Sequence, residues 1–113
     1  MTSPKQDDVP FEDRVYKVFN QRQSIGVSAG HGGAFRGLYL ADSTKKMTER
    51  ALAQEILSVA KVASLRGKLS MREQMIAVAA ETDEHVSRAT FELVPDVPTP
   101  EEYETLRRET LRY

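Results

Sequence analysis

The stretch SAGHGGAFRGLYLADS, residues 28–43, decides how the first half of this chain folds. It holds four of the six glycines in the sequence and one of the two histidines. An apolar segment precedes the glycines, and the residues after them alternate in the manner of a β-strand. We predict that the glycines close a β-hairpin with Gly32 and Gly33 as a two-residue turn, because glycine readily supplies the positive φ angles that such a turn requires.

The hairpin extends to a three-stranded antiparallel meander. Its strands are RVYKVFN (residues 14–20), SIGVSA (24–29) and FRGLYLA (35–41), and a two-residue turn at Gln21–Arg22 joins the first two. Side chains alternate between the faces of a sheet, so the two turns fix which residues share a face. The predicted pairings are Val27 with Leu38, Ile25 with Leu40, Val18 with Ile25, and Tyr16 with Val27. All six residues then lie on one face, which we predict to be the core.

The opposite face of the meander carries three aromatic residues, Phe19, Phe35 and Tyr39, among glycines and serines. Tyr39 falls opposite Gly26, where its ring can cover the bare backbone of a glycine. Two interpretations stay open for this aromatic face. Helices of the same chain cover it in part, or it is a subunit interface.

Helical periodicity begins after the meander. Thr48 has the character of an N-cap, and the apolar residues that follow recur at the helical interval, as Leu52, Ile56, Val59 and Ala63. Gly67 either ends this helix, with Ser70 and Glu73 as the capping box of a second one, or lies inside one long helix. We favour the long helix, bent or weakened at Gly67.

The C-terminal third predicts shorter elements. A short helix is expected over residues 82–94, a stiff proline-rich linker follows, and Thr99 and Pro100 have the residue types of an N-cap and a first helical position. The predicted fold is therefore α+β: a three-stranded meander packed on one long or broken helix, with short C-terminal helices. We expect a disordered tail over residues 1–12, one α+β domain over 13–94, and the linker and last helix over 95–113.

Composition restricts the classes of function. The net charge of −1 provides no strong field for nucleic acid or an anionic membrane, and the absence of cysteine excludes disulfides and thiolate chemistry. The N-terminus lacks the apolar run of a signal peptide, and no apolar stretch reaches the roughly 20 residues that span a bilayer. We expect a soluble cytoplasmic protein.

Known catalytic and cofactor motifs are not matched. Gly30 and Gly32 begin a dinucleotide fingerprint, but Phe35 stands at its third glycine, and Leu38 and Tyr39 follow where a phosphate-binding loop needs Lys and Ser or Thr. His85 lies among acids without a second histidine spaced to share a metal. We therefore expect no enzyme activity, no cofactor and no metal.

A basic run is the one candidate nucleic-acid site. Lys61, Lys68 and Arg72 are spaced by 7 and 4 residues, so a continuous helix places them on one face, where they can contact phosphates. The alternative interpretation is that these three basic residues form only the solvated side of an amphipathic helix.

Four segments occur in a suggestive order: IGVSA (residues 25–29), GLYLADS (37–43), MTERALAQEI (47–56) and VPTPEEYETL (97–106). The series resembles EspD and EspH, mycobacterial proteins associated with type VII secretion, over about residues 14–113. The resemblance implies a chaperone-like accessory or a co-secreted substrate. The Y-x-x-x-[DE] signal associated with export by this route is not formed at Tyr16, Tyr39 or Tyr103, so we expect an accessory that stays in the cytoplasm.

The strand–strand–helix order also resembles the YbaB/EbfC group of small nucleoid-associated proteins, which dimerise and bind DNA. This resemblance implies a homodimer, although the chain opens with a polar tail and a strand rather than with a long helix. The first hypothesis is thus a non-catalytic protein-interaction module, with Phe19, Phe35 and Tyr39 at its interface. The alternative is a DNA-binding protein that uses the basic run.

Overall fold

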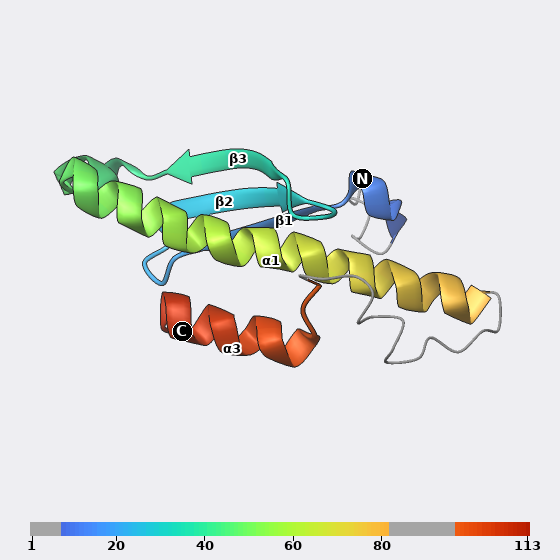
Figure 1. The fold of residues 1–113 in the computed structure, drawn as a ribbon. Coiled ribbons are helices and arrows are strands. Elements are labelled where there is room, and N and C mark those ends of the chain that lie inside the picture. The colour runs from blue at the N-terminus through green and yellow to red at the C-terminus, as the bar shows by residue number, and fades with distance from the viewer. Residues whose placement is uncertain (1–7, 82–96) are drawn as a thin grey trace.

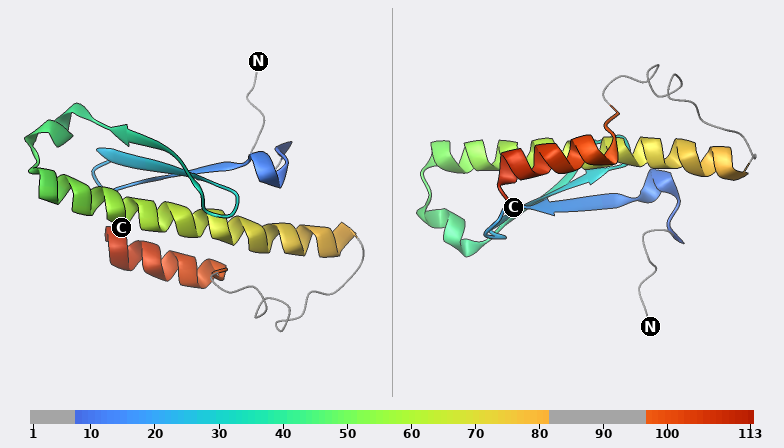
Figure 2. Two further views of the ribbon diagram at one scale, coloured as in Figure 1. Left: turned by 45° about the horizontal axis from the view of Figure 1, so that its top comes forward. Right: turned by 90° about the horizontal axis from the view of Figure 1, so that it is seen from below.

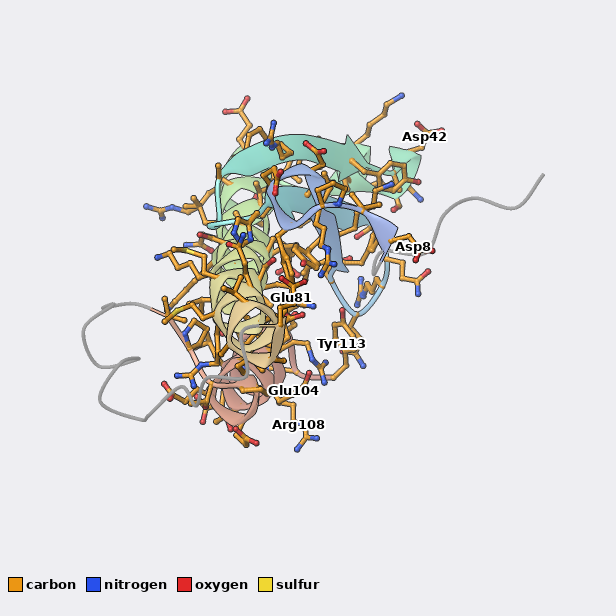
Figure 3. The ribbon with its side chains drawn as sticks, turned by 90° about the vertical axis from the view of Figure 1, so that its right-hand side faces the viewer. Asp8, Asp42, Glu81, Glu104, Arg108 and Tyr113 are labelled. Carbon is orange, nitrogen blue, oxygen red and sulfur yellow. The ribbon has the colours of Figure 1, made fainter. Side chains whose placement is uncertain are left out.

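The computed structural model describes residues 8–81 and 97–113, and it confirms the α+β meander (Figure 1). Strands Val15–Phe19 (β1), Ile25–Gly30 (β2) and Phe35–Leu40 (β3) form an antiparallel sheet with β2 in the middle. Helix Glu49–Glu81 (α1) packs across β1 and β2, and helix Pro100–Leu111 (α3) packs against α1. Seen along α1, the sheet and α3 lie on opposite sides of it (Figure 3).

The core lies between the sheet, α1 and α3. The predicted apolar stripe of α1 faces it: Val59 and Ala63 are fully buried, and Leu52 and Ile56 pack against it while half-buried. The sheet contributes Val18, Ile25, Val27 and Ala29, and α3 contributes Tyr103 and Leu111. The C-terminal helix therefore shares one core with the sheet. Burial in this core raises the pKa of the Tyr103 phenol above its ordinary value of 10.0.

The turn between β1 and β2 is longer than predicted. Asn20 pairs with Ile25 through the backbone, and the Asn20 side-chain oxygen accepts hydrogen bonds from the amides of Ser24 and Ile25 at 2.8 and 3.1 Å. Gln23 adopts a positive φ of 57° within this loop. The predicted pairing of Val18 with Ile25 is therefore wrong by two residues, and Val18 lies opposite Val27 instead. A shift of two preserves side-chain alternation, so the predicted faces of β1 and β2 are retained.

The turn between β2 and β3 is also longer by one residue. The Gly30 amide bonds to the Ala34 carbonyl, which leaves a three-residue loop, with φ angles of 89° at Gly32 and 95° at Gly33. A β-bulge then inserts Arg36, and beyond it the predicted pairs Val27–Leu38 and Ile25–Leu40 are present. The prediction of a two-residue turn is therefore wrong. The predicted register of Leu38 and Leu40 is nevertheless right, because the bulge compensates for the extra loop residue.

Helix α1 is continuous through Gly67, so the break considered at this glycine does not occur. The glycine loop packs directly on it. The Gly32 amide donates a 2.9 Å hydrogen bond to the Gly67 carbonyl, and a Cβ on Gly67 would lie 2.2 Å from the Gly30 carbonyl oxygen and 2.7 Å from Gly33. A Cβ on Gly33 would in turn lie 2.7 Å from the backbone oxygen of Ser64. Glycine is needed at these positions because two backbones touch there.

The predicted helix starts are confirmed. The Thr48 hydroxyl accepts a 3.1 Å hydrogen bond from the Ala51 amide, and Thr99 accepts one of 3.0 Å from the Glu102 amide, with Pro100 at the first helical position. Helix α3 runs antiparallel to α1 along its middle part, and the C-terminal part of α1 extends past the hairpin (Figure 2).

Residues 8–12 differ from the expected disordered tail. Phe11–Asp13 form a 3-10 turn, and the Phe11 ring packs against His31 at a centroid distance of 5.8 Å. The Arg14 guanidinium stacks on Phe11 at 3.7 Å from the ring centroid. A second 3-10 turn, Asp42–Lys46, joins β3 to α1. The rest of the expected tail, the helix expected over residues 82–94, His85 and the start of the linker lie outside the described residues.

Candidate functional site

The edge strand β3 carries the most distinctive surface of the described chain. Phe35, Leu38, Tyr39 and Leu40 are 64, 45, 53 and 41% exposed; we call these four residues the β3 surface. Leu38 and Leu40 face the helix side of the sheet, opposite Val27 and Ile25. Their assignment to the core was nevertheless wrong, because α1 covers β1 and β2 and leaves the third strand open.

Phe19 and Tyr39 meet on the outer face of the sheet, as the alternation predicted. Their rings form an edge-to-face pair with centroids 6.1 Å apart. The ring that covers Gly26 belongs to Phe19, since a Cβ on Gly26 would lie 2.5 Å from it. An open hollow of about 520 Å³ surrounds the pair, with Lys17 and Gly37 among its lining residues. The outer face is thus a shallow aromatic surface.

Phe35 does not join this pair. The bulge at Arg36 places Phe35 opposite Ala29, on the helix side of the sheet. The expectation that Phe19, Phe35 and Tyr39 share one face is therefore wrong for Phe35. The alternation of residue types does not reveal a bulge. The inserted residue reverses the face of the residues that lie between it and the turn, here Phe35.

The basic run lies where the continuous helix was expected to place it. Lys61 is exposed, and Lys68 and Arg72 are half-buried. Arg72 donates a 3.0 Å hydrogen bond to the Pro98 carbonyl, which engages it with the segment before α3. The Glu73 carboxylate forms an ion pair with the Arg66 guanidinium at 2.7 Å.

A buried polar chain, not anticipated from the sequence, joins the glycine loop to α1. Ser70 is completely buried, and its hydroxyl lies 2.8 Å from both the Tyr16 hydroxyl and His31 Nδ1. His31 Nε2 lies 2.8 Å from the Gln74 side-chain oxygen. That oxygen can only accept, so in neutral His31 Nε2 donates to it, Nδ1 accepts from Ser70, and Ser70 accepts from Tyr16. The serine is enclosed, which suits a structural role rather than attack on a substrate.

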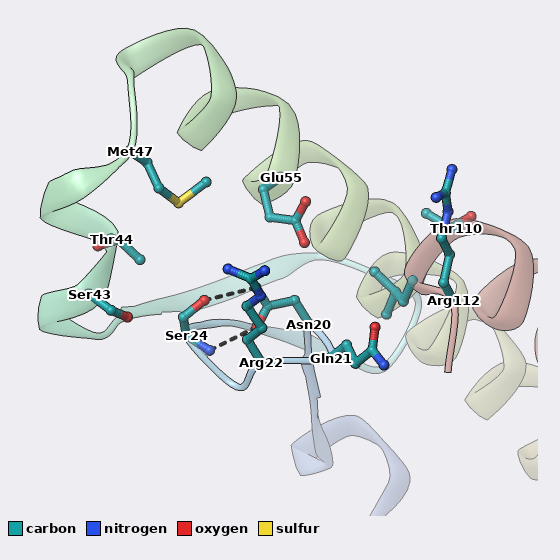
Figure 4. A pocket seen from close by; sticks show the side chains of 11 residues that line it. Asn20, Gln21, Arg22, Ser24, Ser43, Thr44, Met47, Glu55, Thr110 and Arg112 are labelled. Carbon is teal, nitrogen blue, oxygen red and sulfur yellow. Dashed lines mark hydrogen bonds between the residues drawn. The ribbon is translucent and has the colours of Figure 1, made fainter.

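A polar cleft of about 550 Å³ lies between the β1–β2 turn, the turn before α1 and the end of α3 (Figure 4). Arg22 and Glu55 point into it, and Arg112 lines it from the end of α3. Asn20, also in the lining, is committed to the turn by its hydrogen bonds to Ser24 and Ile25. The cleft presents charges of both signs. Among the described residues that line it, no hydrogen bond joins two side chains in the manner of a catalytic acid and base.

Residues 8–81 and 97–113 contain no cluster of three or more His, Cys, Asp or Glu residues that could hold a metal ion. No helix in that part of the chain is both long and apolar enough to cross a membrane.

Comparison with known proteins leaves the family open. No family model matches the sequence, and no curated protein or solved structure is significantly similar to it. The function is therefore inferred from the surfaces described above.

Proposed function

We propose that this chain is a non-catalytic protein-interaction module that acts as a homodimer. The observation that carries the proposal is the β3 surface, which exposes large apolar side chains on both faces of an edge strand. Edge strands of monomeric proteins are commonly protected by charge, proline or a covering segment, since their free backbone groups otherwise pair with other chains. An apolar and open edge strand therefore favours a role in association.

The nature of the partner is proposed from the sequence. The ordered motifs that resemble EspD and EspH suggest an accessory or chaperone-like factor of type VII secretion, and the aromatic pair Phe19–Tyr39 offers such a factor a second apolar surface. Aromatic residues are enriched at protein–protein interfaces because they bury much area at little cost in conformational entropy.

Tyr39→Asp tests this proposal. The exposed position tolerates a carboxylate in the folded monomer, whereas burial of that unpaired charge in an interface costs several kcal/mol, or roughly a hundredfold or more in affinity. We expect an unchanged circular-dichroism spectrum and loss of partner capture in a nuclease-treated pull-down from cells with a type VII system.

Ile76→Asp is the matched control, because Ile76 on α1 is similarly exposed, at 52%, but lies away from β3. It should retain the partners. If both variants capture secretion components as well as the native chain does, the β3 surface is not the binding site.

The alternative, a DNA-binding protein of the YbaB type, is favoured by one observation: α1 is continuous through Gly67, so Lys61 and Lys68 lie two turns apart on one side of the same helix. Lys61→Glu combined with Lys68→Glu should then weaken DNA binding at least tenfold and reduce its salt dependence, as measured by fluorescence anisotropy. Equal binding by Lys45→Glu, outside α1, and by the double variant would exclude this site.

A further inference from the structure

The occupant of the open β3 edge can be specified, on the basis of the proposed homodimer. We infer that β3 pairs antiparallel with β3 of a second copy about a two-fold axis at Tyr39, which joins the two sheets into one of six strands. Leu38 of each copy then lies opposite Leu40 of the other, and the two Tyr39 residues lie opposite each other.

The backbone amides and carbonyls of β3 that point away from β2 belong to the residues that this pairing needs. The Ala41 amide donates to Ser24, so Ala41, Tyr39 and Gly37 direct their amides and carbonyls toward β2. Hydrogen-bonded pairs alternate along an antiparallel ladder, so the amides and carbonyls of Leu38 and Leu40 point to the open edge. Pairing Leu38 with Leu40 of the second copy satisfies all of these groups symmetrically.

The side chains are self-complementary in the same register. Leucines meet leucines on the helix side of the sheet. On the outer side Gly37, which has no atom within 4 Å of a Cβ position, lies opposite Ala41 of the second copy. At both ends the exposed Arg36 lies beside Asp42 of the second copy, which is the first residue of the 3-10 turn after β3; within one copy the Asp42 carboxylate also lies 3.7 Å from the Lys45 ammonium. Opposite charges thus meet at both ends of the paired strands.

The neighbouring registers are less favourable. A two-fold axis at Leu38 brings Arg36 opposite Leu40 of the second copy and draws the bulge into the ladder. On the other side of Tyr39, an axis at Leu40 would set Leu38 opposite Asp42, which lies beyond the end of the strand. The other edge of the sheet is less open than β3: β1 carries Lys17, and the Tyr113 hydroxyl donates a hydrogen bond to the outward carbonyl of Phe19. These features favour β3 and the axis at Tyr39.

The inferred dimer also accounts for the exposed flank of α1. Both helices lie on one side of the joined sheet, with the two β2 strands about 14 Å apart at three strand spacings. Leu57 is 69% exposed and lies two turns before Ser64, on the flank of α1 that contacts the glycine loop. The leucines of the two β3 strands and Leu57 of both helices then line one trough, with the exposed Lys61 one turn further along each helix.

Engineered cysteines test the inference, because the native chain has none. Cα atoms of a non-hydrogen-bonded pair lie about 4.5 Å apart, within disulfide range, so Tyr39→Cys should form a covalent dimer on mild oxidation. Leu38→Cys places its two Cα atoms about 8 Å apart in this register, beyond that range. Lys17→Cys on β1 gives the rate of random collision. We expect Tyr39→Cys to cross-link at least tenfold faster than either control on a non-reducing gel.

A charge exchange provides a second measurement that keeps Tyr39. Arg36→Asp and Asp42→Arg should each shift sedimentation toward the monomer, and the double variant should recover the dimer. Faster cross-linking of Leu38→Cys would overturn the register, and equal rates for all three cysteines would overturn β3 pairing. If pairing fails while Tyr39→Asp still abolishes partner capture, the role as a protein-interaction module stands without this homodimer, and the edge has another occupant.

Discussion

Gly67→Ala is expected to destabilise the fold by about 3 kcal/mol or more. The added Cβ would lie 2.2 Å from the Gly30 carbonyl oxygen, so the glycine loop must move away from α1 and lose the hydrogen bond from Gly32 to Gly67. Helix propensity acts in the opposite direction, since alanine is favoured over glycine inside a helix by about 1 kcal/mol. The sign of the change in the free energy of unfolding, measured in urea, thus separates the two effects.

Gly37→Ala is the control for this experiment. Gly37 has open space at its Cβ position and an ordinary φ, so its replacement should change the stability by no more than about 0.5 kcal/mol. Stabilisation by Gly67→Ala would show that the loop does not pack on the helix as described.

Ser70→Ala is expected to cost about 2 kcal/mol, the second-largest effect. Ser70 is completely buried, and its loss leaves the Tyr16 hydroxyl and His31 Nδ1 without the partner that joins them. An unpaired buried polar group loses hydration without compensation, which is why removal of one partner costs more than the bond itself. Urea unfolding of the variant measures the difference.

Ser58→Ala makes the same substitution in the same helix at a position where the hydroxyl bonds only to the Gln54 carbonyl within α1. It should be neutral or slightly stabilising, because alanine has the higher helix propensity. If the two serine variants lose equal stability, the polar chain contributes nothing to the fold.

The architecture was predictable because local signals agreed with one another. Glycines marked the hairpin, alternation gave the faces of β1 and β2, and Thr48 and Thr99 marked the helix starts. Loop lengths were not predictable in the same way. A four-residue loop closed by Asn20 and a bulge at Arg36 both depend on hydrogen bonds that residue types do not specify.

The candidate surface was predictable only in part. The placement of Phe19 and Tyr39 on one face follows from alternation, but their ring contact was not predicted, and the exposure of Leu38 and Leu40 depends on which strands α1 covers. Periodicity identifies an apolar face and gives no information about the width of the element that packs on it. Gly67 is the residue that could have indicated that the loop packs on α1, because a glycine inside an otherwise strong helical pattern often marks a close approach of another segment.

The three-residue glycine loop and the bulge at Arg36 have a consequence for how this sequence can diverge. The third loop residue lets Gly32 reach the Gly67 carbonyl, and the bulge accommodates the one residue that would otherwise shift the register of β3. Deletion of Arg36 alone would remove the bulge and leave the three-residue loop and the pairs Val27–Leu38 and Ile25–Leu40 in place. Homologous sequences should therefore accept a one-residue gap at the bulge more readily than one in the loop, where the Gly32 amide donates to the Gly67 carbonyl.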